Sequence, residues 1–131
     1  MHGLHLTADL YQCPGGELLT DPQTLRTACL EAVVASGLRP VGELFHRFAP
    51  AAGAAADTPV GITGVVLLTE SHLAVHTWPE LGGVTLDVYV CNHGIDNSAR
   101  AERLLQAMVA AFVPRQIERH RLVRGRGPTE N

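Results

Sequence analysis

The chain has 131 residues, of which 46% are apolar, and a formal charge of -3. This composition supports one compact domain over residues 1–131 and excludes a disordered chain. No apolar run reaches about 18 residues, so no membrane partner is expected. The first residues lack a basic segment followed by an apolar one, so we expect no secretory signal and a cytoplasmic location.

The basic residues and the cysteines narrow the chemistry further. A short basic segment over residues 119–126 is typical of a solvated end, so no nucleic-acid partner is expected. Three cysteines are an odd number, which argues against a disulfide framework. All 10 basic residues are arginine. Without lysine, the chain cannot hold pyridoxal phosphate or a carbonyl substrate as a Schiff base on its own amine.

Hydrophobic periodicity and turn residues predict six strands and two helices. In chain order these are a strand over residues 4–11, a helix from about 20 to 37, strands over 40–48, 61–69, 73–77 and 84–91, a helix from about 96 to 113, and a strand over 116–123. A loop of small residues over 49–60 interrupts the series, with a proline at each flank. Short hairpin connections favour an antiparallel sheet, and we expect an α+β two-layer sandwich with both helices on one face.

The strand over residues 84–91 has one apolar and one polar face. Val84, Leu86, Val88 and Val90 alternate with Thr85, Asp87, Tyr89 and Cys91. We expect the valine-rich face to meet the helices and Cys91 to lie on the other face. That second face of the sheet needs cover, which a partner subunit would provide.

Residues 70–80 contain a serine, two histidines, a tryptophan and two carboxylates between two apolar strands. A zinc set of His72, His76, Cys91 and His93 is disfavoured, because on a strand the first two lie about 13 Å apart. A hydrolase serine is also disfavoured, because Ser71 lacks the Gly-x-Ser-x-Gly turn. The residues alone equally allow Ser71 to cap a turn.

The motif Glu70-Ser-His-Leu-x-x-His-Thr-Trp-Pro-Glu80, followed by Asp87-Val-x-x-Cys91, resembles the short prokaryotic S-adenosylmethionine decarboxylase proenzymes. Segments 3–13, 45–48 and 61–66 match this family in the same order. The resemblance implies that Ser71 attacks the Glu70 carbonyl, and that the chain splits into a β chain, 1–70, and an α chain, 71–131. The α chain would begin with a covalent pyruvoyl group made from Ser71. Its ketone would condense with the substrate amine and accept the electrons left by CO₂.

The resemblance also assigns roles to single residues. His76 matches the histidine that assists chain cleavage by proton transfer, and Cys91 the cysteine that protonates the product carbon. Thr63 stands in place of a serine that supports processing, and shares a face with Ser71 if the strand between them is unbroken. Phe48 matches an aromatic residue that stacks on adenine, with core packing as the alternative. Glu80 meets a substrate amine or ribose, or lies in solvent.

Departures from the family pattern bear on the substrate. Residues 51–59 are an insertion that could line the pocket or act as its lid, Leu81 replaces a residue that is often aromatic, and Asn92 replaces a glycine. S-adenosylmethionine, for spermidine biosynthesis, is the favoured substrate, and ornithine or arginine the alternative. A dimeric ligand-binding regulatory module is the non-enzyme alternative. The resemblance implies a homodimer with active sites near the interface, and no metal is expected.

Overall fold

The computed structural model describes residues 1–128, which form one sheet and a helical layer. In chain order the elements are β1 (Gly3–Tyr11), α1 (Glu17–Thr20), α2 (Pro22–Ala35), β2 (Pro40–Arg47), β3 (Ile62–Leu68), β4 (Ser71–Trp78), the 3-10 turn η1 (Pro79–Leu81), β5 (Gly83–Cys91), α3 (Ser98–Phe112) and β6 (Gln116–Arg124). The six predicted strands and both long helices are therefore present.

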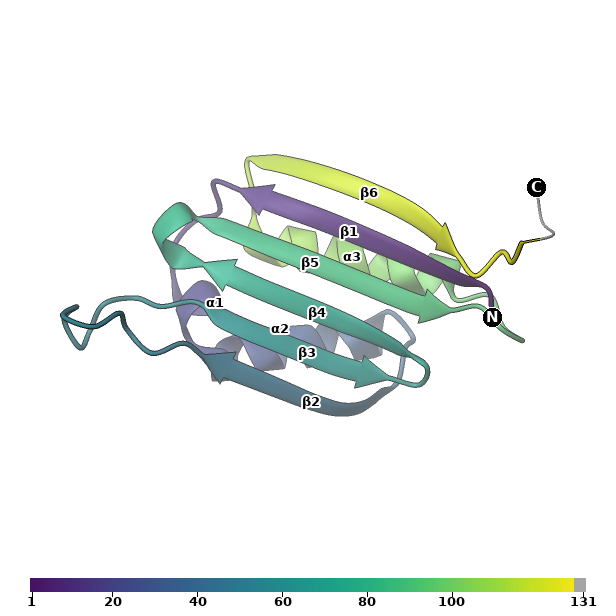
Figure 1. Cartoon of the computed structure of the whole chain (residues 1–131), viewed down its shortest axis with the longest axis horizontal. Helices are drawn as coiled ribbons and strands as arrows, with labels where there is room; N and C mark the ends of the chain where they lie inside the picture. Colours follow the sequence, from purple (N-terminus) through teal and green to yellow (C-terminus); the bar gives the residue numbers. More distant parts are fainter. Residues whose placement is uncertain (129–131) are drawn as a thin grey trace.

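The six strands form one antiparallel sheet in the order β2-β3-β4-β5-β1-β6. Hairpins join β3 to β4 and β4 to β5, while α2 and α3 make the longer connections. Both long helices pack on the same face of the sheet (Figure 1). The α+β two-layer fold expected from the sequence is confirmed.

The core lies between this sheet and the helices. Strand alternation sends Val84, Leu86, Val88 and Val90 of β5 into it, and each of them is at most 2% exposed. Helix α3 presents the apolar stripe predicted by its period, with Leu104, Leu105, Met108 and Phe112 among its members. Helix α2 begins where Asp21 accepts a hydrogen bond from the backbone N–H of Thr24, as a capping side chain does.

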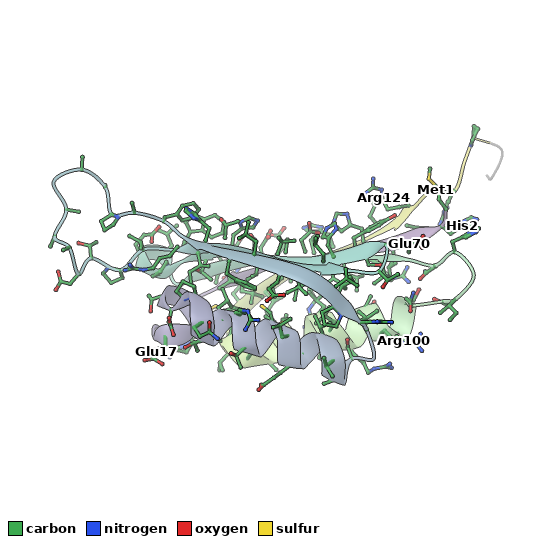
Figure 2. The ribbon with its side chains drawn as sticks, turned by 90° about the horizontal axis from the view of Figure 1, so that it is seen from below. Met1, His2, Glu17, Glu70, Arg100 and Arg124 are labelled. Atoms are coloured by element: carbon green, nitrogen blue, oxygen red, sulfur yellow. The ribbon has the colours of Figure 1, made fainter. Side chains whose placement is uncertain are left out.

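No element of residues 1–128 covers the opposite face of the sheet, as the edge-on view shows (Figure 2). We call it the open face. The loop between β2 and β3 projects from one end of the sheet in the same view. Apolar side chains on the open face remain accessible, including Leu44 at 70%, Leu122 at 56% and Leu67 at 51% exposure. Within the described chain, no helix is long and apolar enough to cross a membrane.

Two local features differ from the expectation. The short helix α1 was not predicted, because four residues give no measurable period. Strand β4 begins at Ser71 rather than at Leu73, because Leu68 pairs directly with Ser71 and leaves a hairpin turn of Thr69 and Glu70. The first serine of the motif is thus part of the sheet.

Candidate active site

The turn between β3 and β4 holds Glu70 in a left-handed conformation, with φ of 57°. A two-residue hairpin turn favours positive φ at its central positions, where glycine or asparagine is the usual residue. A glutamate there is strained, because its Cβ crowds the backbone. The Glu70–Ser71 peptide bond therefore lies at the least relaxed point of the hairpin.

Ser71 is held beside Cys91 by the pairing of β4 with β5. The backbone N–H of Cys91 donates a hydrogen bond to Ser71 Oγ at 3.1 Å. Cys91 itself is half-buried, and its Sγ accepts the backbone N–H of His93 at 3.5 Å. The fold thus brings together two of the residues singled out in the sequence, which lie 20 positions apart.

A group of polar side chains lies next to Ser71 on the open face. His5 Nε2 contacts one oxygen of Asp87, and His72 Nε2 lies 3.6 Å from the other. The Tyr89 ring stacks on His72, with 5.7 Å between ring centroids, and meets the edge of His5. We call these four residues the His5–Asp87 cluster.

The His5–Asp87 cluster borders an open cavity of about 320 Å³. Its walls are His5, His72 and Tyr89, with Glu70 and Ser71 on one side and Arg124 on another. The Arg124 guanidinium lies 5.8 Å from the centre of the Tyr89 ring, where a cation is attracted to the aromatic face. This cavity therefore presents polar and charged side chains of both signs close to Ser71.

A second group lies at the other end of the open face. Thr63 and His76 are paired residues of β3 and β4, and Thr63 Oγ1 lies 3.1 Å from His76 Nδ1. Phe48 and Glu80 border a cavity of about 420 Å³ near this end, together with Trp78. Phe48 is 46% exposed, so it is not a core residue. The inserted loop contributes Ala51, Ala54, Thr58 and Pro59 to the same cavity.

The two groups do not meet within one chain. His76 is five residues beyond Ser71 in β4, about 16 Å at a rise of about 3.3 Å per residue. Thr63 and Ser71 would share a face if the strand between them were unbroken, and this condition is not met, because the turn at Thr69 and Glu70 separates β3 from β4. Ser71 pairs with the buried Leu68, so its position in the strand belongs to the helix-covered face. Thr63 pairs with His76 on the open face.

The other two cysteines have different surroundings. Burial raises the pKa of the Cys13 thiol, and raises the pKa of the Cys29 thiol to about 12. Both therefore remain protonated near neutral pH, and neither lies in the two cavities. Within residues 1–128, no three His, Cys, Asp or Glu side chains come together in a way that could hold a metal ion.

Two parts of this arrangement were not found from the sequence. Asn92, which replaces a glycine of the family pattern, accepts the backbone N–H of Asn97 at 2.8 Å and donates to Ser98, and these two hydrogen bonds fix the loop before α3. His5 and Arg124 come from strands at distant ends of the chain. The sequence placed His5 on the first strand, whereas Arg124 lies one residue beyond the predicted last strand. Only the β1–β5 and β1–β6 pairings bring the two residues to Ser71.

Comparisons with known proteins identify the family of this chain. The family model for S-adenosylmethionine decarboxylase matches residues 4–125. A proenzyme of that name from Thermotoga petrophila is 36% identical over 111 residues, which are 85% of this chain and 78% of the relative. Its counterpart from Archaeoglobus fulgidus is 32% identical over 94% of this chain and 97% of its own length.

A solved structure is also similar. The crystal structure of the adenosylmethionine decarboxylase from Aquifex aeolicus superposes with a TM-score of 0.80 at 30% identity, and covers 98% of this chain and 95% of that one. Fold and sequence thus point to one class, the decarboxylase proenzymes. The chain belongs to the S-adenosylmethionine decarboxylase family.

Proposed function

We propose that this chain is a self-processing decarboxylase of S-adenosylmethionine, whose cofactor is a pyruvoyl group made from Ser71. One observation carries the proposal: the family match spans residues 4–125 and includes the strained Glu70–Ser71 bond beside Cys91. The residues fit such a group. Ser71 is half-buried, its Oγ is held in a fixed position, and the chain has no lysine that would supply another carbonyl-binding amine.

Processing would begin with attack of Ser71 Oγ on the Glu70 carbonyl carbon, which exchanges the amide for an ester. Loss of the Ser71 Cα proton then breaks the Cβ–Oγ bond, and the Glu70 carboxylate leaves with residues 1–70. At the new N-terminus of residues 71–131, water replaces the former backbone nitrogen of residue 71, which departs as ammonia. The left-handed Glu70 supports this sequence of steps, because opening the Glu70–Ser71 bond frees Glu70 to leave its disfavoured backbone conformation. Both fragments would remain in one domain, held by the sheet.

The surroundings of Ser71 support roles in turnover. The pyruvoyl ketone supplies a site for covalent capture of an amine and an acceptor for the electron pair left by CO₂. Cys91 would return a proton to the product carbon, a role supported by the contact of its backbone N–H with Ser71 Oγ. Phe48 would stack on adenine and Glu80 would meet a substrate amine or the ribose, since both border one cavity. That cavity lies at the opposite end of the sheet from Ser71.

This separation supports a homodimer with shared sites. We propose that two open faces stack about a two-fold axis, so that the Ser71 end of one protomer meets the His76 end of its partner. The two-fold operation makes both such contacts at once. His76, positioned by Thr63, would then reach the Ser71 region of the partner and assist processing. The exposed apolar residues Leu44, Leu67 and Leu122 would be covered by the same contact.

Intact-mass measurement tests the processing step. The purified protein should consist of two fragments divided between Glu70 and Ser71, and Ser71→Ala should remain one uncleaved, inactive species. A wild-type chain that stays whole after long incubation would exclude self-processing and favour a regulatory module.

Release of labelled CO₂ tests the substrate. S-adenosylmethionine, ornithine and arginine would be compared at equal concentrations with the cleaved protein. Release from S-adenosylmethionine is expected, and release solely from ornithine or arginine would overturn the assignment.

A further inference from the structure

A third cavity lies on the helix side of the Glu70–Ser71 bond. Cys91 is among the residues that border it, and the function proposed above gives no role to its two arginines. The cavity measures about 300 Å³ and lies where the turn before β4, the chain after α2 and the start of α3 meet. Thr69 and Glu70 form one wall, and Arg39 and Arg100 contribute to the others. Glu70 borders both this cavity and the one next to the His5–Asp87 cluster. Glu70, on the carbonyl side of the scissile bond, therefore lines the same cavity as two arginines.

The charges in this cavity are unbalanced. Glu70 is the sole acidic residue among the cavity-lining residues of the described chain, whereas Arg39, Arg100 and His93 are basic. Arg100 donates to the neutral Asn97 Oδ1 at 3.1 Å, and no carboxylate of residues 1–128 forms an ion pair with Arg39 or Arg100. Two cations thus face a turn that carries one negative charge.

The two arginines are positioned by different elements. Arg39 directly precedes β2, and Arg100 lies in the first turn of α3. The Arg100 side chain packs against Gly37, where an added Cβ would lie 3.2 Å from its Nε. Figure 2 shows Arg100 on the helix side of the sheet, at the same end as Glu70. The fold therefore keeps both cations at the end of the sheet where the chain would be cut.

We propose that Arg39 and Arg100 form a carboxylate-binding site for the new C-terminus that cleavage creates at Glu70. This inference rests on the proposed self-processing. In the elimination step, the Ser71 Cα proton is lost, the Cβ–Oγ bond breaks, and its electron pair passes to the Glu70 α-carboxyl group. Negative charge develops on a leaving group that forms part of the wall of this cavity. Cations next to it stabilise that charge both in the transition state and in the product.

The same site would act after cleavage. Residue 70 then carries two carboxylates, the side chain and the new terminus, in place of one. Cleavage also removes the hairpin restraint that joined β3 to β4, so the freed end of β3 needs another attachment. Arginine can hold a carboxylate with two parallel hydrogen bonds, which would keep the terminus out of the cavity beside Ser71.

The test compares Arg39→Gln/Arg100→Gln with wild type and with Arg115→Gln. Arg115 is exposed and borders none of the cavities described here, so its variant controls for loss of positive charge. Freshly purified precursors would be followed by intact mass, with and without hydroxylamine, which cuts an ester and leaves an intact N-terminal Ser71. The ion pairs proposed between the two arginines and the new terminus would be partly exposed, so each would contribute modestly. We therefore expect the double variant to complete cleavage about tenfold more slowly, with the ester accumulating.

Two further measurements separate the possible results. In a Ser71→Ala background the arginine substitutions should leave the melting temperature nearly unchanged, whereas in the cleaved protein they should lower it. Lysine at both positions should restore most of the cleavage rate. Equal cleavage rates without ester in all three proteins would overturn the carboxylate site, while a wild type that never forms ester or fragments would overturn self-processing itself. If the arginine substitutions lowered the melting temperature equally in both backgrounds, the carboxylate site would also be overturned, because the two arginines would then have a purely structural role.

Discussion

Cys91 takes part in the site through two separate groups, its backbone and its thiol. Its N–H holds Ser71 Oγ at 3.1 Å, and this hydrogen bond does not depend on the side chain. The thiol is half-buried near the cleavage point, unlike Cys13 and Cys29, which are buried in the core. Substitution at Cys91 can therefore separate formation of the cofactor from its use.

We expect Cys91→Ala to cleave at nearly the wild-type rate but to turn over about a hundredfold more slowly, because a positioned proton donor contributes on this scale. Intact mass gives the cleaved fraction, and CO₂ release per cleaved chain gives the turnover. Cys13→Ala is the matched control and should keep its turnover. Normal turnover by Cys91→Ala would remove the thiol from the mechanism.

The polar-face position of Cys91 was predictable, because the period of two in residues 84–91 is unbroken. Its contact with Ser71 was not predictable, because it depends on the register in which His72 pairs with Tyr89. Likewise, His5 was predicted on the first strand, but Arg124 lies just beyond the predicted last strand and is part of β6 in the structure. Nothing in the local sequence indicates that β1 lies between β5 and β6 in the sheet.

Among the elements, the β3–β4 hairpin combines structure and chemistry in its two-residue turn. Glu70 at φ of 57° is disfavoured relative to glycine by about 1 kcal/mol. In a Ser71→Ala background, the free energy of unfolding should be higher for Glu70→Gly than for Glu70→Ala by about that amount. Both variants lack the glutamate carboxylate, but alanine keeps the Cβ that makes the left-handed conformation unfavourable. Urea denaturation of both variants measures the difference.

With Ser71 present, the same pair tests whether strain assists cleavage. Glu70→Gly should cleave more slowly than Glu70→Ala, by about fivefold if the whole strain is relieved on opening the amide. Cleavage at equal rates, despite a measured stability difference, would show that the turn geometry does not drive the reaction.

Helix α2 carries a thiol whose titration affects stability. Burial raises the pKa of Cys29 from 9.0 to about 12, so between these pH values the unfolded chain loses a proton that the folded chain keeps. The free energy of unfolding should therefore fall as pH rises through this range, by up to about 1.4 kcal/mol per pH unit. Below pH 9.0 this contribution is constant.

Urea denaturation at pH 8 and pH 10 measures this fall. Cys29→Ala should be less stable at pH 8, because it leaves a cavity, but should lose less stability on going to pH 10. Other groups that titrate in this range affect both proteins alike, so the difference between them isolates Cys29. Parallel pH dependences would contradict the role of this thiol.

Element positions followed closely from periodicity, and the main errors came from connections. The face shared by Thr63 and Ser71 was argued from an unbroken strand. A turn of two residues has no hydrophobic period, and Thr69 and Glu70 carry none of the glycine, asparagine or aspartate that would indicate it. A connection was predicted after residue 69, but its position was not. Because the turn consists of Thr69 and Glu70, Ser71 lies on the opposite face from Thr63.

At the scale of the whole molecule, the protein has one covered and one open sheet face, with functional groups at both ends of the latter. The His5–Asp87 cluster is next to Ser71, while Thr63, His76 and Trp78 lie toward the other end. A sequence can predict that a face is open from alternation alone. It cannot predict that the two groups lie too far apart to act within one chain, because that follows from the order and register of the strands.

Mixed dimers test this directly. If His76 acts on the Ser71 of the partner, a dimer of one Ser71→Ala chain and one His76→Ala chain contains one complete site. Its Ser71 comes from the His76→Ala chain and its His76 from the Ser71→Ala chain. Co-expression of the two variants with different tags should therefore cleave the His76→Ala chain, which should cleave poorly when expressed alone.

Intact mass identifies the cleaved chain by its substitution, and tandem purification through both tags confirms that it came from a mixed dimer. The Ser71→Ala chain should stay whole in every sample. The matched control is a chain that carries both substitutions, co-expressed with His76→Ala, because this pair contains no complete site. If mixed dimers form but the His76→Ala chain stays uncleaved, the shared site is excluded. Full cleavage of His76→Ala alone would instead show that His76 is not needed for processing.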